Sequence, residues 1–167
     1  MNCVIEKIQR AKENQSTFLD LSGMGLTELP EVIGELASLE RLVVSCNKLT
    51  ALPEAIGRLK SLRRLNVSRN RLTELPEAIG QLRSLERLVV SCNQLTALPE
   101  SIGELTSLTT LVVWNNRLTE LPEAIGRLSD LRRLDVSDNK LTEAQAARGV
   151  DERYYDDVSC ICRGDVE

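Results

Sequence analysis

One motif, L-x-x-L-x-V-x-x-N-x-L, occurs five times along the chain, and its copies are always 23 residues apart. The second leucine of the motif marks the copies: Leu42, Leu65, Leu88, Leu111 and Leu134. Between them runs T-x-L-P-E-x-I-G-x-L, with its proline and glycine at the same place in every unit. A fixed period of this length is typical of a solenoid, in which one structural unit stacks on copies of itself.

Each unit is predicted to contain a strand, an inward turn and a helical return. The alternation in R-L-V-V-S favours a short strand, and identical strands one repeat apart stack in parallel. In L-P-E-x-I-G-x-L the proline opens a helical turn and the glycine ends it. The asparagine after the strand can satisfy backbone groups of a bend that points into the core, so its role is interpreted as structural. It recurs as Asn47, Asn70, Asn93, Asn116 and Asn139.

The two ends of the chain depart from the repeat. Residues 1–15 are predicted to form an N-terminal capping helix, because apolar residues there share one helical face. These residues are Val4, Ile5, Ile8 and Ala11. Such a helix would cover the core that a terminal repeat otherwise exposes.

Residues 16–142 are predicted to form six repeat units, the first of them degenerate because Met24 replaces its asparagine. After Leu141 the pattern breaks, and residues 143–167 form either a C-terminal cap helix or a tail. The cap is favoured by apolar residues at helical spacing. They are Val150, Tyr154, Val158 and Ile161.

The 23-residue consensus resembles the plant-intracellular, Ras-group-related type of leucine-rich repeat. The opening, IEKIQRAKENQSTFLDLSGMGLTELPE, is similar to the start of repeat arrays in bacterial Roco-type proteins. The resemblance covers residues 4–142. It implies an α/β fold, a right-handed curved solenoid with a parallel sheet on the concave face and short helical turns on the convex face. It also implies a non-catalytic module that binds a protein partner on the concave sheet.

The composition argues against an enzyme. The chain has no histidine, which removes the commonest general base and metal ligand. No phosphate-binding G-x-x-x-x-G-K-[ST] occurs, and Cys160 with Cys162 would supply only half of the ligands of a zinc site. We therefore expect no catalytic residues, no cofactor and no metal.

The mild net charge of −4 gives no reason to expect nucleic acid or a membrane as a partner. The first residues, MNCVIEKIQRAKENQ, do not form a secretory signal. Extracellular leucine-rich-repeat proteins usually carry cysteine-rich flanks on both sides, whereas this N-terminal flank has only Cys3. A cytoplasmic location is expected, with a monomer as the simplest state and self-association left open.

The predicted binding surface consists of the residues that alternate outward from the strands. Because Leu42 and Val44 point into the core, residues 41, 43 and 45 of the same repeat should point outward. The equivalent residues of the other repeats should do the same, so each position forms a column across the sheet. The residues chosen from these columns are Arg41, Val43, Arg64, Asn66, Arg87, Val89, Val112, Trp114, Arg133 and Asp135.

Two features of this surface have two interpretations each. Trp114 replaces a serine and is expected to face solvent, either as an interface anchor or without a partner. Arg41, Arg64 and Arg87, here called the arginine row, invite a partner with carboxylates or phosphates. The alternative is a self-satisfied surface ion-pair ladder of Glu40 and Glu86 with the adjacent Arg63 and Arg64.

The alternative to an interaction module is a structural or designed consensus scaffold without an evolved ligand. It rests on the near-identity of 38–57 and 84–103, which differ at only two positions.

Overall fold

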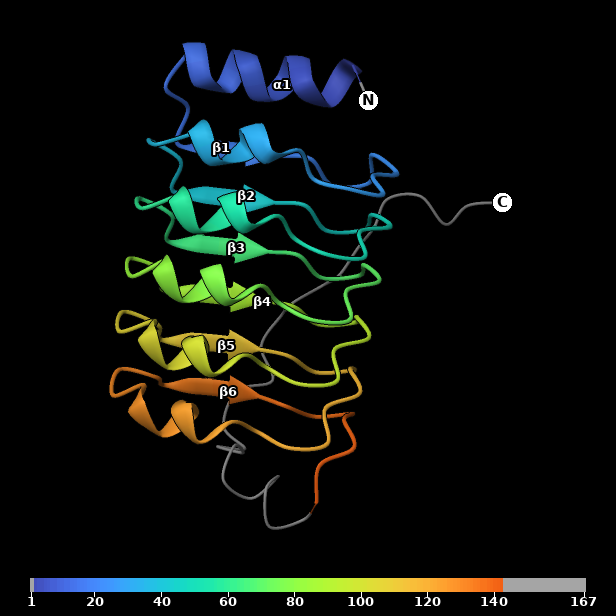
Figure 1. Cartoon of the computed structure of the whole chain (residues 1–167), viewed down its shortest axis with the longest axis vertical. Coiled ribbons are helices and arrows are strands. Elements are labelled where there is room, and N and C mark those ends of the chain that lie inside the picture. Colours follow the sequence, from blue (N-terminus) through green and yellow to red (C-terminus); the bar gives the residue numbers. More distant parts are fainter. Residues whose placement is uncertain (1, 143–167) are drawn as a thin grey trace.

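The computed structural model describes residues 2–142 and shows a solenoid of stacked repeats (Figure 1). An α-helix, α1 (Asn2–Glu13), precedes the stack. The parallel strands are β1 (Phe18–Asp20), β2 (Arg41–Val43), β3 (Arg64–Asn66), β4 (Arg87–Val89), β5 (Thr110–Val112) and β6 (Arg133–Asp135). The 3₁₀ helices are η1 (Glu31–Glu35), η2 (Glu54–Arg58), η3 (Glu77–Gln81), η4 (Glu100–Glu104) and η5 (Glu123–Arg127).

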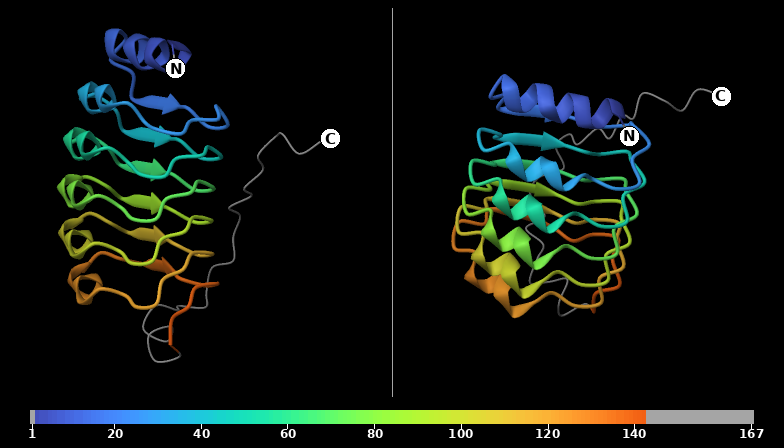
Figure 2. Two further views of the ribbon diagram at one scale, coloured as in Figure 1. Left: turned by 45° about the vertical axis from the view of Figure 1, so that its right-hand side comes forward. Right: turned by 45° about the horizontal axis from the view of Figure 1, so that its top comes forward.

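The strands form one sheet in the order β1-β2-β3-β4-β5-β6, and each pairs in parallel with the next. The pairing repeats without a shift, so that Leu42 lies opposite Leu65 and Leu65 opposite Leu88. The sheet forms one side of the stack and the 3₁₀ helices the other (Figure 2). This architecture confirms the predicted leucine-rich-repeat solenoid.

Aliphatic side chains fill the space between the sheet and the 3₁₀ helices. The strand leucines contribute from one side and isoleucines such as Ile56 and Ile79 from the other, and both of these isoleucines have no exposed surface. One continuous cluster runs from Val4 to Val136. Each repeat therefore completes its core only with its neighbours, as a solenoid requires.

The asparagine after each strand joins two repeats, which confirms its predicted structural role. Asn70 Nδ2 donates to the carbonyl oxygens of Val67 and Val44, both at 3.0 Å, and Val44 belongs to the preceding repeat. Asn70 Oδ1 accepts a hydrogen bond of 3.0 Å from Leu49 N–H, also of the preceding repeat. Asn47, Asn93, Asn116 and Asn139 repeat these contacts.

The residue before the asparagine adopts a left-handed backbone, which the sequence analysis did not foresee. In the first unit this position is Gly23, but later units place non-glycine residues there, at an energetic cost. The φ values are 66° at Gly23, 57° at Cys46, 54° at Arg69, 55° at Cys92, 54° at Asn115 and 52° at Asp138. The direction of the side chain at this position is therefore set by the turn, and it does not follow the inward–outward alternation of the strand.

The glycine of each 3₁₀ helix lets adjacent repeats approach closely. A Cβ on Gly80 would lie 2.6 Å from the carbonyl oxygen and 2.8 Å from the Cβ of Ser101 in the next repeat. Gly34, Gly57 and Gly103 face the same restriction, whereas a Cβ on Gly126 would meet none of the described residues within 4 Å. The glycine thus sets the distance between repeats on the convex side.

Helix α1 lies across the first repeat (Figure 1). Its residues Val4, Ile8 and Ala11 are buried, and Lys12 Nζ lies 2.6 Å from Glu35 Oε2 in η1. That hydrogen bond and the ammonium charge hold the pKa of the Glu35 carboxyl below its usual value. The expectation that Ile5 shares the buried face was wrong, since it is 38% exposed. Positions 4, 8 and 11 already complete the buried stripe, and Ile5 lies at its edge.

Within the described residues, no helix is long and apolar enough to cross a membrane. The predicted C-terminal cap or tail, residues 143–167, lies outside the described part of the chain.

Substituting Gly80 with alanine should destabilise the protein by about 2–3 kcal/mol, because the new Cβ overlaps the backbone of the next repeat. Gly126→Ala is the matched control and should change the free energy of unfolding by less than about 0.5 kcal/mol. Urea unfolding followed by circular dichroism measures both. Equal effects at the two positions would show that inter-repeat contact is not what selects glycine.

Arg69→Gly should stabilise the protein by roughly 0.5–1 kcal/mol, because glycine adopts the left-handed backbone without the cost that arginine incurs. It also removes the Arg69 Nε atom, which is buried and has no hydrogen-bond partner among residues 2–142. Arg71→Gly, two residues away at an exposed site outside the positive-φ positions, should instead lose a few tenths of a kcal/mol. A loss of stability in Arg69→Gly would contradict this account of the turn.

Candidate interaction surface

The in-register sheet brings the outward-facing residues of successive repeats side by side. Arg41 pairs with Arg64, and Arg64 with Arg87, so the arginine row occupies neighbouring strands. Val89 is paired with Val112 in the next column, and Thr110 and Arg133 continue the arginine column. The predicted site residues therefore lie on one continuous face.

The start of the arginine row is extended by an aromatic ring that the predicted site omitted. Phe18 is 45% exposed, and the guanidinium carbon of Arg41 lies 4.1 Å from the centre of its ring. This is a cation–π contact, which fixes the guanidinium while leaving its donors available. Phe18 occupies the same column as the arginines, so its position in the repeat was the signal that could have identified it.

Within residues 2–142, no carboxylate forms an ion pair with the arginine row. Among residues 2–142 the ion pairs are Lys12–Glu35 and Arg63–Glu86, the latter at 3.2 Å. The predicted ion-pair ladder of Glu40 and Glu86 with Arg63 and Arg64 is therefore confirmed at one step, Arg63–Glu86, and within residues 2–142 neither glutamate pairs with Arg64.

Arg87 is the least exposed arginine of the row. Partial burial, followed by the charges of Arg133 and Arg64, lowers the pKa of Arg87. A guanidinium remains charged at neutral pH despite such a shift. The guanidinium groups of the row therefore repel one another, and an anionic partner would reduce this repulsion.

A shallow depression of about 220 Å³ lies beside the arginine row. Its walls combine charged and apolar groups: Arg41, Arg64 and Arg87 on one side, and Val43, Asn66 and Val89 on the other. A second hollow, of about 260 Å³, lies near the beginning of the first strands and includes Phe18, Glu40 and Glu86. The row is thus the rim of a recessed surface.

The valine column is less accessible than expected. Val43 is partly buried, but Val89 and Val112 are only 3% and 1% exposed. Valines on adjacent middle strands lie within about 5 Å of each other and shield one another, which the outward direction alone did not predict. Val89 and Val112 therefore stiffen the surface and offer little area to a ligand.

Asn66 and Asp135 in the same column have local partners. Asn66 Oδ1 accepts hydrogen bonds of 3.0 Å from the N–H and 2.7 Å from the hydroxyl of Ser68. Asp135 Oδ1 accepts the same pair from Ser137, at 3.1 and 2.6 Å. The sequence pattern Asn/Asp-x-Ser was the signal for this turn. These side chains stabilise the ends of strands β3 and β6.

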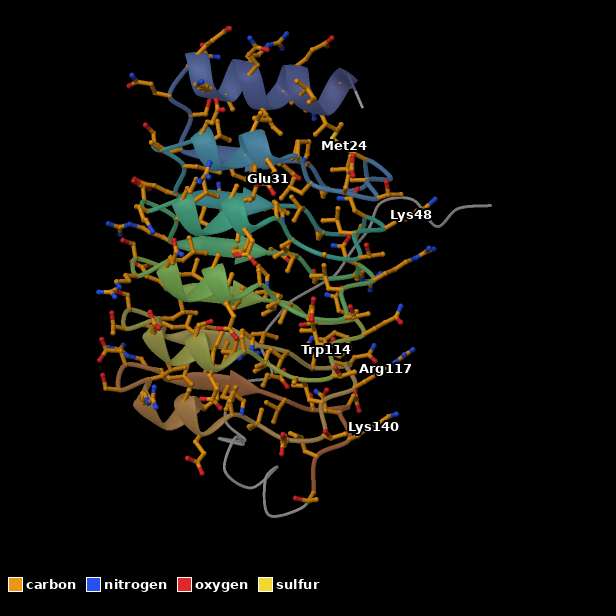
Figure 3. The ribbon with its side chains drawn as sticks, in the orientation of Figure 1. Met24, Glu31, Lys48, Trp114, Arg117 and Lys140 are labelled. Atoms are coloured by element: carbon orange, nitrogen blue, oxygen red, sulfur yellow. The ribbon has the colours of Figure 1, made fainter. Side chains whose placement is uncertain are left out.

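Trp114 is of intermediate burial, so part of this residue is accessible to solvent. It follows β5 at the edge where Arg117 projects from the next turn (Figure 3). Its backbone carbonyl accepts hydrogen bonds from Cys92 N–H at 3.1 Å and from Asn116 Nδ2 at 3.4 Å. These hydrogen bonds from Cys92 and Asn116 fix the backbone from which the Trp114 ring extends.

No group of histidine, cysteine, aspartate and glutamate side chains within residues 2–142 is arranged to hold a metal ion. The chemistry that this face offers is hydrogen bonding and ion pairing by guanidinium groups next to apolar surface.

Comparison with known proteins assigns the repeats to a family. The sequence matches the family described as "Leucine-rich repeat region" over residues 15–96, and the one described as "Leucine rich repeat" over residues 83–141. No curated protein matches the chain.

Solved structures agree with this assignment. The Leptospira interrogans leucine-rich-repeat protein LIC12759 is similar, with a TM-score of 0.66, 35% identity and 80% of this chain covered. The crystal structure of PEPR1-AtPEP1 is also similar, with a TM-score of 0.62, 32% identity and 67% of this chain covered. This chain spans 41% of the first and 16% of the second. By its repeats, its fold and these similarities, the chain is a leucine-rich-repeat protein.

Proposed function

We propose that this chain is a non-catalytic interaction module that binds a protein partner on its concave sheet. Leucine-rich-repeat domains generally mediate protein–protein interactions. The observation that supports the concave location is the arginine row: it has no carboxylate partner among residues 2–142 and forms one wall of a recessed, partly apolar surface.

The surface has the composition of an interface. Arginine and aromatic residues are enriched where proteins bind, and here Phe18, the arginine row and Trp114 lie on consecutive strands or directly after them. Val89 and Val112 keep the centre rigid, which lowers the entropic cost of binding.

The finer assignments are part of the same proposal. The constant 23-residue period supports the Ras-group-related type of repeat and the likeness to Roco-type arrays. We propose a cytoplasmic monomer with α1 as its N-terminal cap, and with neither nucleic acid nor membrane as its partner. A structural scaffold without a ligand is the second candidate, favoured by the near-identity of 38–57 and 84–103.

The test is affinity capture from a cytosolic lysate with three forms of the chain. The concave variant Val43→Lys/Trp114→Ser changes two partly buried residues of the face, and Ser is the residue that other repeats carry at the tryptophan position. The control Ala51→Lys/Thr106→Ser makes the same change in charge at exposed sites outside the strands. Thermal unfolding checks that all three forms are folded.

We expect the wild type and the control variant to retain the same protein, and the concave variant to retain at least about tenfold less, a loss of about 1.4 kcal/mol in binding. Retention of that protein by all three forms would move the binding site away from the concave face. Empty captures by all three forms would favour the scaffold.

A further inference from the structure

We propose that the arginine row recognises an acidic, extended segment of a partner protein that lies along the axis of the solenoid. This inference rests on the proposed function and specifies the chemistry of its partner: carboxylates three residues apart, with an apolar residue between them.

The first support is the concentration of positive charge. Neighbouring strands are about 4.8 Å apart, so the Cα atoms of Arg41 and Arg87 are separated by roughly 9.6 Å with Arg64 between them. No carboxylate of residues 2–142 lies within 4.0 Å of any of the three guanidinium groups. A partner carboxylate would relieve the repulsion as well as form its own hydrogen bonds.

The second support is the contrast between this row and the rest of the protein. The chain carries a net charge of −4, with 25 acidic and 21 basic residues. A general attraction to anions is therefore absent, and the row is a local basic surface on an acidic protein. Such a patch selects an anionic group by position and so contributes specificity.

The third support identifies the anion as part of a polypeptide. The depression beside the row is lined by Val43, which is only partly buried, as well as by the arginines. A phosphate or a nucleic-acid backbone would use the charges and leave this apolar wall uncovered. An acidic segment of protein supplies carboxylates to the row and an apolar side chain to the depression.

The spacing of the strands sets the spacing of the carboxylates. A polyproline-II segment places every third side chain on one face and rises about 3.1 Å per residue, so residues i and i+3 are about 9.3 Å apart. That distance matches two strand spacings and brings two carboxylates to Arg41 and Arg87. In a β-strand, side chains on the same face are about 6.7 Å apart, and this distance matches neither one nor two strand spacings of the sheet.

The probes are fluorescein-labelled synthetic peptides, proline-containing and about twelve residues long, tested by fluorescence anisotropy against the folded chain. The leading peptide contains E-x-L-E, with its glutamates three residues apart. Comparison peptides place the glutamates next to each other, replace them by lysine, or replace them by phosphoserine.

We expect E-x-L-E to bind at least about tenfold more tightly than the lysine peptide, and about threefold more tightly than the peptide with adjacent glutamates.

Arg64→Gln/Arg87→Gln should weaken binding of E-x-L-E at least about tenfold, and added salt should weaken it in the wild type. Arg58→Gln/Arg127→Gln removes the same charge from equivalent convex positions at the ends of η2 and η5, and should change affinity by less than about twofold.

The inference is overturned if no glutamate peptide binds, if the phosphoserine peptide alone binds, or if both double variants weaken binding equally. Affinity capture distinguishes failure of the acidic-segment inference from failure of the proposed function. A protein lost from Val43→Lys/Trp114→Ser but retained by Arg64→Gln/Arg87→Gln would leave the concave interface in place and refute the acidic segment.

Discussion

The hydrogen bonds of the inward-pointing asparagine hold this structure together between repeats. Each amide donates to carbonyl oxygens of its own and the preceding repeat, and its oxygen accepts from a backbone N–H of the preceding repeat. Losing the buried amide of Asn70 would leave the Leu49 N–H without this partner, while the carbonyls of Val44 and Val67 would each keep one bond, from Asn47 and Asn93 respectively. The glycine of the 3₁₀ helix provides the matching constraint on the convex side, where Ser101 leaves no room for a Cβ on Gly80.

These constraints separate the residues that maintain the stack from those that can vary. The inward leucines, the asparagine and the glycine are repeated in each regular unit, whereas the outward positions differ in some units, as with Phe18 and Thr110 in the arginine column. The exact register makes Arg41, Arg64 and Arg87 neighbours on the surface, although successive members of the row are 23 residues apart in sequence. The recessed, positively charged face follows directly from the repeat.

The repeat, the parallel sheet and the role of Asn70 could be predicted because they depend on patterns that recur with a fixed period. Features that depend on a neighbour or on backbone dihedrals could not. Val89 points outward as predicted but is buried by its surroundings, and Arg69 adopts a left-handed backbone that its residue type does not suggest. The engagement of Asn66 with Ser68 was predictable in principle from turn chemistry. The sequence placed both Arg63 and Arg64 beside Glu86, and the structure shows that Arg63 is the one that pairs with it.

The most direct test of this account is the stability of Asn93→Ala compared with Asn139→Ala in urea unfolding. The two asparagines make the same set of hydrogen bonds, but Asn93 is 8% exposed whereas Asn139 is less buried, at the last described strand. The account predicts a loss of about 2–4 kcal/mol for Asn93→Ala, and less than half of that loss for Asn139→Ala, where water can replace the amide. A loss below about 1 kcal/mol at Asn93, or equal losses at both positions, would contradict the claim that these buried hydrogen bonds hold the repeats together.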